Sequence, residues 1–388
     1  MRIALVCPDV SSNSLVRMYP IAKVLARRHE LQVLGFKFGD GIFEPYRDEF
    51  DYETIAARRM PYFLGQVQEM ARRVRADAIY AFKPVASSMW VGLLTRRIHD
   101  IPLFLDIEDW EAGWYYDVPR LDRLKHLAHV ERPNGFLWAW LTEKLVSKAD
   151  ETFVVSRFLQ NHFGGTILPH GADTTVFDPA RWSRSEALRR IGLQDGRYIV
   201  FTGSPMPNKG LDDLLDAVSN IGDSRVRILV VGSFRHDPKY RERLIGRYGD
   251  RLILIGPRPH AEMPMFLAAA DVVALPQQPC RETIAQVPGK VFEAMAMARP
   301  IIATAVGDLK EILDGCGFVV PARSAERLAA GLDWILSNPD EAAALGQKAR
   351  LRCEELYSWD AMEQILTGKL ETAQRHESLS ALKVRPGN

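Results

Sequence analysis

The chain has 388 residues, of which 47% are hydrophobic and 26% are charged, and its formal net charge is +1. This length suits two domains of roughly two hundred residues each. The near-zero net charge excludes the basic field of a nucleic-acid-binding protein. Cysteines are too few and too scattered for a disulfide framework or a zinc site; they are Cys7, Cys280, Cys316 and Cys353.

The N-terminal residues MRIALVCP are typical of a first strand rather than of a signal peptide. No apolar run reaches the length of a membrane span. We therefore expect a cytoplasmic protein, with peripheral membrane association left open.

Short apolar runs alternate with amphipathic helical patterns in two successive series. Strand-like runs of the first series lie at 3–7, 31–36, 78–80, 103–106 and 151–155. Those of the second lie at 198–202, 226–231, 252–255, 272–275, 300–304 and 317–320. Helical patterns between them include 15–28, 63–75, 211–221 and 325–336, and a last one covers 358–374. This alternation predicts an α/β protein with two doubly wound parallel sheets.

The junction between the two series lies at 173–196, where turn and helix signals occur without a strand. We predict an N-terminal domain over 1–175, a second domain over 176–357, and a C-terminal helix with a tail over 358–388. A dinucleotide-binding Rossmann protein would carry G-x-G-x-x-G after its first strand. Here that turn reads PDVSSNS, which argues against such an oxidoreductase.

The strongest chemical signal is the segment FTGSPMPNKGLDDLLDAV, in which a strand ends at Gly203 and a helix follows Gly210. Such a turn directs backbone amides and the positive end of a helix toward a ligand above the sheet. The ammonium of Lys209 stands where it could reach a diphosphate. The alternative is an ordinary surface lysine in a βα loop.

A second signal is VPGKVFEAMAMARPIIAT, where Pro288 and Gly289 open a helix that carries Glu293 in its first turns. Glu293 either faces a ligand or only complements the helix dipole. A third segment, ILPHGADTTVFDP at 167–179, is by itself a loop with a turn.

Together, in this order, the three segments resemble the retaining glycosyltransferases of the GT-B fold, the glycosyl transferases group 1. The turn from Gly203 to Gly210 is similar to that family's G-x-x-x-x-x-K-G turn. Residues 169–179 are similar to its P-N-G-V-D-x-x-x-F-x-P segment, and 293–303 to its E-A-M-A-x-G-x-P-V-I-A segment, followed by a Ser-Trp pair at 358–359. The resemblance covers most of 150–370.

This resemblance implies two Rossmann-like domains that face a central cleft, and a last helix within 358–388 that crosses back to the N-terminal domain. It further implies that Lys209 neutralises the donor diphosphate, that Glu293 binds the nucleotide ribose, and that amides near Lys290 cradle a phosphate. The expected donor-binding residues are Gly203, Ser204, Lys209, Gly210, Arg258, Glu282, Gly289, Lys290, Val291 and Glu293. No cofactor or metal ion is implied.

Three positions depart from the family pattern. Ser204 stands where an arginine usually follows the glycine, so another cation, Arg235 or Arg281, would have to replace it. Ala285 stands where a sugar-contacting glutamate is usual, with Glu282 three residues earlier. The first βα turn has Ser12, Asn13 and Ser14 in place of a glycine pair.

The N-terminal half offers candidate acceptor contacts. The loop DIEDWEAGWYYD follows the strand at 103–106, at the edge where open α/β sheets bind their ligands. Asp109 is a candidate catalytic carboxylate beside Lys209, and Trp110 a candidate acceptor contact, because sugar rings pack on aromatic faces. The alternative is a structural loop whose acids cap the next helix. Ser12, Asn13 and Ser14 are the remaining candidate acceptor contacts.

Basic and aromatic residues mix in the stretch 119–140. They could form a weak peripheral contact with anionic lipid. Acids dilute the charge, and a helical excursion packed on the domain is the favoured interpretation.

The sequence thus predicts an enzyme, a hexosyltransferase that moves a sugar from a UDP- or GDP-sugar to a saccharide, lipid-linked or small-molecule acceptor, with retention. Two alternatives remain. A nucleotide-sugar 2-epimerase shares the architecture, and a non-catalytic nucleotide-sugar-binding protein would explain Ser204 and Ala285.

Overall fold

The computed structural model describes residues 1–234 and 237–383, with side chains described as far as residue 372. Contacts divide the chain into two compact units. Unit 1 comprises Met1–Pro169 together with the chain from Met362 onward, and unit 2 comprises His170–Ala361. The sequence prediction placed these divisions after 175 and before 358.

Unit 1 is built on a seven-stranded sheet. Its strands are β1 (Arg2–Cys7), β2 (Glu30–Lys37), β3 (Tyr52–Ala56), β4 (Ala78–Phe82), β5 (Leu103–Ile107), β6 (Glu151–Val154) and β7 (Thr166–Ile167). Its helices are α1 (Leu15–Leu25), α2 (Tyr62–Arg73), α3 (Met89–His99), α4 (Arg120–Ala128), α5 (Phe136–Glu143), α6 (Arg157–Phe163) and most of α16 (Trp359–Lys383). The edge strands β3 and β7 were not predicted from the sequence.

Unit 2 is built on a six-stranded sheet. Its strands are β8 (Arg197–Thr202), β9 (Val226–Val231), β10 (Leu252–Leu254), β11 (Val272–Leu275), β12 (Ile301–Thr304) and β13 (Phe318–Val320). Its helices are α7 (Arg184–Ile191), α8 (Leu211–Ser219), α9 (Pro238–Tyr248), α10 (Met263–Ala268), α11 (Arg281–Ala285), α12 (Lys290–Ala296), α13 (Leu309–Ile312), α14 (Ala325–Ser337) and α15 (Pro339–Leu356).

Both sheets are parallel, and both have the strand order of a doubly wound fold. The orders are β3-β2-β1-β4-β5-β6-β7 and β10-β9-β8-β11-β12-β13. In each unit the chain starts at a central strand, adds strands toward one edge of the sheet, and then crosses over to add strands on the other side of the first strand. The predicted fold class, two Rossmann-like α/β units, is confirmed.

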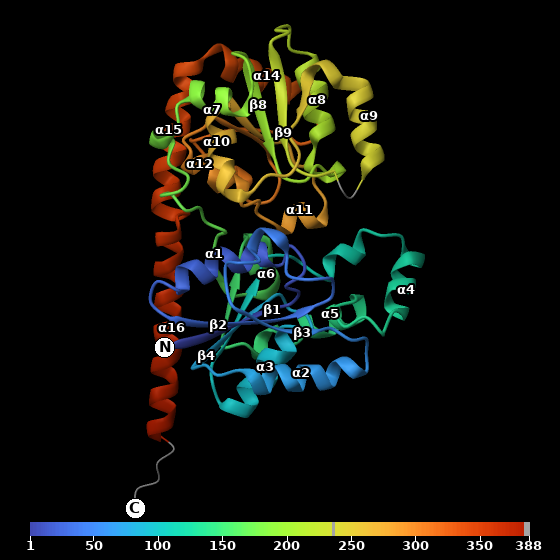
Figure 1. Ribbon diagram of the computed structural model, residues 1–388, viewed down its shortest axis with the longest axis vertical. Helices are drawn as coiled ribbons and strands as arrows, with labels where there is room; N and C mark the ends of the chain where they lie inside the picture. The colour runs from blue at the N-terminus through green and yellow to red at the C-terminus, as the bar shows by residue number, and fades with distance from the viewer. Residues whose placement is uncertain (235–236, 384–388) are drawn as a thin grey trace, which may run out of the picture. The chain divides into compact units, whose positions relative to one another are not determined.

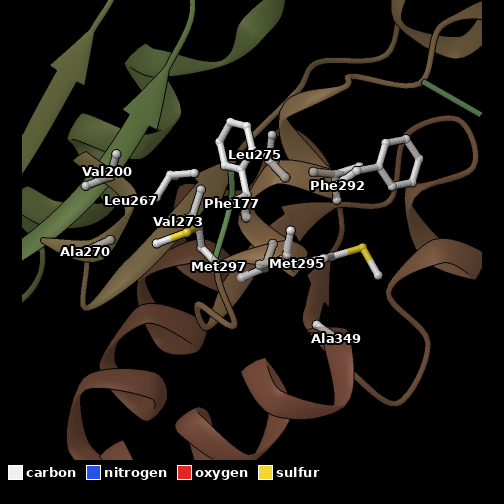
Figure 2. Close-up of a cluster of buried hydrophobic side chains, with 14 of the residues drawn as sticks. Phe177, Val200, Leu267, Ala270, Val273, Leu275, Phe292, Met295, Met297 and Ala349 are labelled. Carbon is white, nitrogen blue, oxygen red and sulfur yellow. The ribbon is translucent and has the colours of Figure 1, made fainter. Parts of the chain in front are cut away.

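Alternate residues of the strands in unit 2 belong to two separate hydrophobic cores, one on each face of the sheet. Val200 packs with residues of α10, α12 and α15, whereas its neighbours Ile199 and Phe201 pack with α8, α9 and α14. Figure 2 shows part of the first core, where Phe292 and Met295 of α12 lie near Leu275. Burial on both faces explains why these strands are continuous apolar runs.

The point where the chain order reverses fixes where a ligand can bind. In open α/β sheets, loops leave neighbouring strands in opposite directions at this point and open a crevice beyond the carboxyl ends of the strands. In unit 2 the point lies between β8 and β11, and in unit 1 between β1 and β4. The loops that follow these strands are therefore the first places to look for a site.

A buried ion pair fixes the corresponding edge of unit 1. Arg17 of α1 binds Asp106 of β5 through two hydrogen bonds, Nε to Oδ1 at 2.8 Å and Nη2 to Oδ2 at 2.9 Å. It also donates to the carbonyl oxygens of Leu168 and Pro169, at 2.9 Å each. Both charged side chains are 1% exposed, and Tyr80 donates a further hydrogen bond to Asp106. The ion pair between Arg17 and Asp106 thus links α1, β4, β5 and the segment 168–169 of unit 1.

Among the described residues, no helix combines the length and the apolar character needed to cross a membrane.

Asp106→Asn should destabilise unit 1 strongly, because it leaves the guanidinium of Arg17 buried without its counter-charge. We expect a loss of about 3–5 kcal/mol in the free energy of unfolding, measured by urea denaturation. Asp122→Asn, which removes an exposed ion pair with Lys125, is the control and should leave the free energy of unfolding close to that of wild type. If both substitutions changed the free energy of unfolding equally and only slightly, the buried ion pair would not have the stabilising role assigned to it.

Candidate functional site

The turn from β8 to α8 places Lys209 beyond the carboxyl end of the sheet in unit 2. The strand ends at Thr202, and Gly203 and Gly210 both adopt positive φ, +96° and +74°. A Cβ at Gly210 would overlap the carbonyl oxygen of Pro276, which follows β11. The loops after β8 and β11 therefore touch at the reversal point, and Gln278 N donates to Asn208 O across them at 2.9 Å.

Lys209 is held by side chains of α11. Its Nζ lies 3.2 Å from Oε1 of Glu282 and 3.4 Å from Oε1 of Gln286. The other carboxylate oxygen of Glu282 accepts a hydrogen bond from Asn208 Nδ2 at 2.9 Å. The Lys209 and Glu282 side chains are 17% and 18% exposed, so this ion pair is shielded yet still reached by solvent. The Lys209 side chain is thus paired and shielded, and its role toward a diphosphate stays a prediction.

Lys290, the first residue of α12, turns its side chain back toward β8. Its Nζ donates to the carbonyl oxygen of Thr202 and lies 5.2 Å from the centre of the Phe201 ring. Burial of the ammonium, together with the nearby positive charge of Lys209, lowers the pKa of Lys290 to about 7, against the opposing effect of Glu293. Two lysines from different loops therefore approach the end of the same strand.

Glu293 lies one turn further along α12 and is paired with a histidine that sequence reasoning missed. Its Oε1 is 2.8 Å from Nε2 of His260, in the short helix His260–Glu262 after β10. Burial of the ring opposes its charged form, but the hydrogen bond and the charge of Glu293 raise the pKa of His260. The ring also packs 5.3 Å from that of Phe177. Glu293 is thus more than a complement to the helix dipole.

The other predicted donor residues are arranged around this group. Ser204 and Arg258 are exposed, Val291 is buried in the core, and Gly289 lies against His170, whose Cβ would be 3.5 Å from an added Cβ. Arg281 is exposed at the start of α11, and Arg235 lies outside the described residues. The structure therefore brings together Gly203, Lys209, Glu282, Lys290 and Glu293, and leaves Arg258 at the periphery.

In unit 1, Asp109 belongs to a cluster of three carboxylates around one lysine. Lys83 follows β4 in a left-handed conformation, φ +66°. Its Nζ lies 2.6 Å from Asp109 Oδ2, 2.8 Å from Glu111 Oε1 and 3.3 Å from Glu108 Oε1. The acids of this loop thus bind Lys83, and the short helix that follows, Gly113–Tyr116, has no side-chain cap. The acids therefore do not cap that helix, while both a structural role of the loop and a contact with the acceptor stay predictions.

Two carboxyl groups near this cluster favour the protonated state. Burial raises the pKa of Glu108 to about 8, Lys83 opposes the rise, and Asp109 adds to it. Burial also raises the pKa of Glu143 to about 7, although the Ala112 amide donates to this carboxylate and opposes the change. The three carboxylates around Lys83 carry more negative charge than its ammonium can neutralise. Protonation of a carboxyl group reduces this excess charge.

The predicted acceptor residues lie in two loops of unit 1. Trp110 packs its ring among Tyr116, Phe158 and His162, with centroids 4.9 to 5.6 Å away. Ser12 and Ser14 hydrogen-bond each other in the turn after β1, and Ser12 also donates to Asp9 O. Asn13 between them is exposed.

The stretch 119–140 forms α4 and α5, and its charges have local partners. Arg123 donates to the carbonyl oxygens of Tyr115 and Tyr116, and Lys125 pairs with Asp122. Leu121 and Leu124 are 74% and 62% exposed. The helical excursion is present, and membrane contact stays a prediction.

Sequence reasoning missed Lys83, His260 and the Arg17–Asp106 pair. The only signal for Lys83 was its place directly after an apolar strand, and His260 lay two residues beyond the predicted Arg258. In the described part of the chain, no group of three or more His, Cys, Asp or Glu side chains is arranged to hold a metal ion.

The sequence is similar to a family of known enzymes. Residues 196–338 match the family described as glycosyl transferases group 1. A D-inositol 3-phosphate glycosyltransferase of Kineococcus radiotolerans is 30% identical over 355 residues, which cover 80% of this chain and 76% of that relative. A GDP-mannose-dependent monoacylated alpha-(1-6)-phosphatidylinositol monomannoside mannosyltransferase of Corynebacterium glutamicum is 31% identical over 216 residues, 54% of this chain and little more than half, 56%, of that relative.

Solved structures share the fold at low sequence identity. Anabaena HepE in complex with UDP is 18% identical, with a TM-score of 0.74 over 96% of this chain and all of that one (100%). Sucrose-phosphate synthase from Thermosynechococcus elongatus is 21% identical, with a TM-score of 0.73 over 98% of this chain and 100% of that one. At these identities the likeness establishes the architecture alone.

Glu108→Gln should change how stability depends on pH. The folded-state pKa of Glu108, about 8, exceeds its value in an unfolded chain, about 4.3. Between these values the folded state binds the proton more tightly, so the free energy of unfolding falls as pH rises. The variant has no carboxyl group at this position to lose a proton. The difference in free energy of unfolding between variant and wild type should therefore shift in favour of the variant from pH 5 to pH 8.

Urea unfolding at pH 5, 6.5 and 8 measures the effect, with Glu44→Gln, an exposed carboxylate of unit 1, as the matched control. Part of the fall should remain in Glu108→Gln below pH 7, owing to Glu143. A difference from wild type that stays constant with pH would contradict the shift.

Proposed function

The chain belongs to the glycosyl transferases group 1 family, and we propose that it transfers a glycosyl unit from a nucleotide-diphosphate sugar to a hydroxyl acceptor, with retention of anomeric configuration. The observation that carries the donor assignment is the place of Lys209. It stands beyond the end of β8 at the reversal point of unit 2, shielded but reached by solvent.

The chemistry of the transfer explains why a lysine is needed there. As the bond between sugar and diphosphate breaks, negative charge grows on the departing phosphate. A preorganised cation next to that charge stabilises the transition state more than the ground state. The N-terminal end of α8, which begins directly after Gly210, adds positive potential at the same place. This assignment gives the neutralising role to the protein and requires no metal ion, so activity should persist in EDTA.

Glu293 suits the nucleotide ribose, because a carboxylate accepts hydrogen bonds from neighbouring hydroxyls. His260 holds one of its oxygens, Oε1, and so restricts how the carboxylate can turn. The second oxygen then faces the ligand in a fixed orientation. In this proposal Glu293 binds a part of the donor far from the breaking bond.

The acceptor is assigned to unit 1. Its reversal point carries the serine turn 12–14 after β1, and the neighbouring loop after β5 carries Asp109 and Trp110. Hydroxyl groups of a saccharide, a lipid-linked sugar or a small molecule would meet carboxylates and an aromatic ring there. The relatives named above act on inositol phosphate and on phosphatidylinositol mannosides, which makes these the first acceptors to test.

A thermal-shift screen tests the donor assignment directly. UDP, GDP, ADP and their sugar conjugates are each added to the protein, with GDP-mannose first because it is named for a relative. A ligand that binds only the folded state raises the melting temperature by mass action. One nucleotide class should do so at micromolar to millimolar concentration. If none does, the proposal fails, and if one binds without turnover on any acceptor, a binding protein is favoured instead.

Lys209→Ala and Glu293→Gln should have different kinetic signatures. Lys209 faces charge that grows during the reaction, so its loss should lower kcat as well as donor affinity, by roughly 1.5–3 kcal/mol in kcat/KM. Glu293→Gln removes binding that is equal in ground and transition states, so it should mainly raise KM for the donor. Both constants are measured for each variant on one donor.

Lys348→Ala, an exposed lysine on α15, is the matched control and should behave like wild type. If Lys209→Ala also behaves like wild type, the diphosphate site lies elsewhere.

A further inference from the structure

The Lys290 ammonium occupies the place where β8 ends. It donates to the carbonyl oxygen of Thr202, the last residue of that strand. An added Cβ at Gly203 would lie only 2.6 Å from Lys290 Nζ, so the glycine leaves room for this side chain. The next residue, Ser204, is the exposed position at which the family usually has an arginine.

Two charged groups act on Lys290 directly, and each of them is paired with a further group. Lys209 approaches from the turn after β8, and Glu293 from the same helix as Lys290. Glu282 of α11 pairs with Lys209, and His260 from the segment after β10 pairs with Glu293. Of the two carboxylates, Glu282 is thus engaged by Lys209, and Glu293 is hydrogen-bonded to His260.

Lys290 itself has a neutral partner. Within residues 1–234 and 237–372, its hydrogen-bond acceptor is the Thr202 carbonyl oxygen and it forms no ion pair. Burial and the Lys209 charge lower its pKa to about 7, so the neutral amine is populated there at neutral pH. A lysine in this state gains most from an anionic ligand, because the anion supplies the counter-charge that the protein does not.

We propose that Lys290 is a second side-chain contact to the donor diphosphate, in place of the arginine replaced by Ser204, and that it takes up a proton as the nucleotide sugar binds. This inference rests on the proposed function and adds to it. Lys209 is paired with Glu282 before the ligand arrives, whereas Lys290 acquires its charge with the ligand.

The proposal fixes how donor affinity depends on pH. Binding of the dianion favours the ammonium form, so the bound-state pKa of Lys290 rises and the complex holds more protons than the free protein above neutral pH. Affinity should then fall by up to roughly tenfold for each pH unit above the free-state value. The diphosphate of a nucleotide sugar keeps its two negative charges throughout this range, so the ligand does not supply the proton.

Isothermal titration calorimetry measures this uptake without any variant. The full chain is titrated with the nucleotide sugar that gave the largest thermal shift, at pH 6 and pH 8, in buffers of different ionisation enthalpy. The apparent binding enthalpy changes with the buffer in proportion to the protons taken up. We expect close to one proton at pH 8 and close to none at pH 6.

Variants assign the proton to its residue. Lys290→Met should abolish the uptake and weaken binding at least tenfold at pH 6.5, with a smaller loss at pH 8.5, where the free amine must first be protonated for the contact to form. His260→Gln should keep the uptake, and Lys348→Met, an exposed lysine of unit 2, should match wild type throughout. Circular dichroism melts confirm that each variant is folded.

Two failures can be told apart. If no nucleotide or nucleotide sugar binds the wild-type protein at pH 6.5, the proposed function is wrong and this inference falls with it. If one binds with no proton uptake at pH 8, or with an uptake that Lys290→Met retains, the donor site stands and the role of Lys290 is overturned.

Discussion

The reversal of chain order within a parallel sheet is the constraint on which the candidate site depends. All strands of unit 2 point the same way, so every loop that follows a strand emerges at one edge. Only between β8 and β11 do the loops leave in opposite directions, and that is where a crevice forms. Lys209 follows β8, and Glu282 and Lys290 follow β11. The contact between Gly210 and Pro276 then sets how closely the two loops approach.

Two pairs at this edge, Lys209 with Glu282 and His260 with Glu293, are present without a ligand. They determine which existing contacts a ligand must replace. A diphosphate that reaches Lys209 takes it from Glu282, so its Coulomb gain is reduced by the pair that it separates. In our proposal, Glu293 keeps its contact with His260 while its other oxygen binds the ligand. Lys290 would give up only a hydrogen bond to a backbone carbonyl. The two lysines would then contribute by different routes, one by exchanging a partner and one by changing its protonation state.

The features that could be predicted from the sequence were those that a short, contiguous stretch of residues determines. Strands buried on both faces are continuous apolar runs, and all eleven of the predicted runs are strands in the structure. β3 and β7 escaped prediction because β3, an edge strand, contains Glu53 and Thr54 in place of a continuous apolar run, and β7 has two residues. Lys209 and Glu293 were found because each lies within a contiguous motif. Arg17 with Asp106, Lys83 with Asp109, and His260 with Glu293 were not, because their partners are 89, 26 and 33 residues apart. Only the folded sheet brings them together.

The two units differ in the sign of the charge that they place at their strand ends, and this difference supports the division of roles. In unit 2, Lys209 and Lys290 lie next to the end of β8, with one carboxylate paired to Lys209. In unit 1, three carboxylates surround Lys83 at the ends of β4 and β5. An anion at that second place would meet excess negative charge in a poorly solvated setting, which is unfavourable by several kcal/mol at short range in order of magnitude. A neutral hydroxyl can instead donate to those carboxylates. The diphosphate therefore suits unit 2 and the hydroxyl-bearing acceptor suits unit 1, on electrostatic grounds alone.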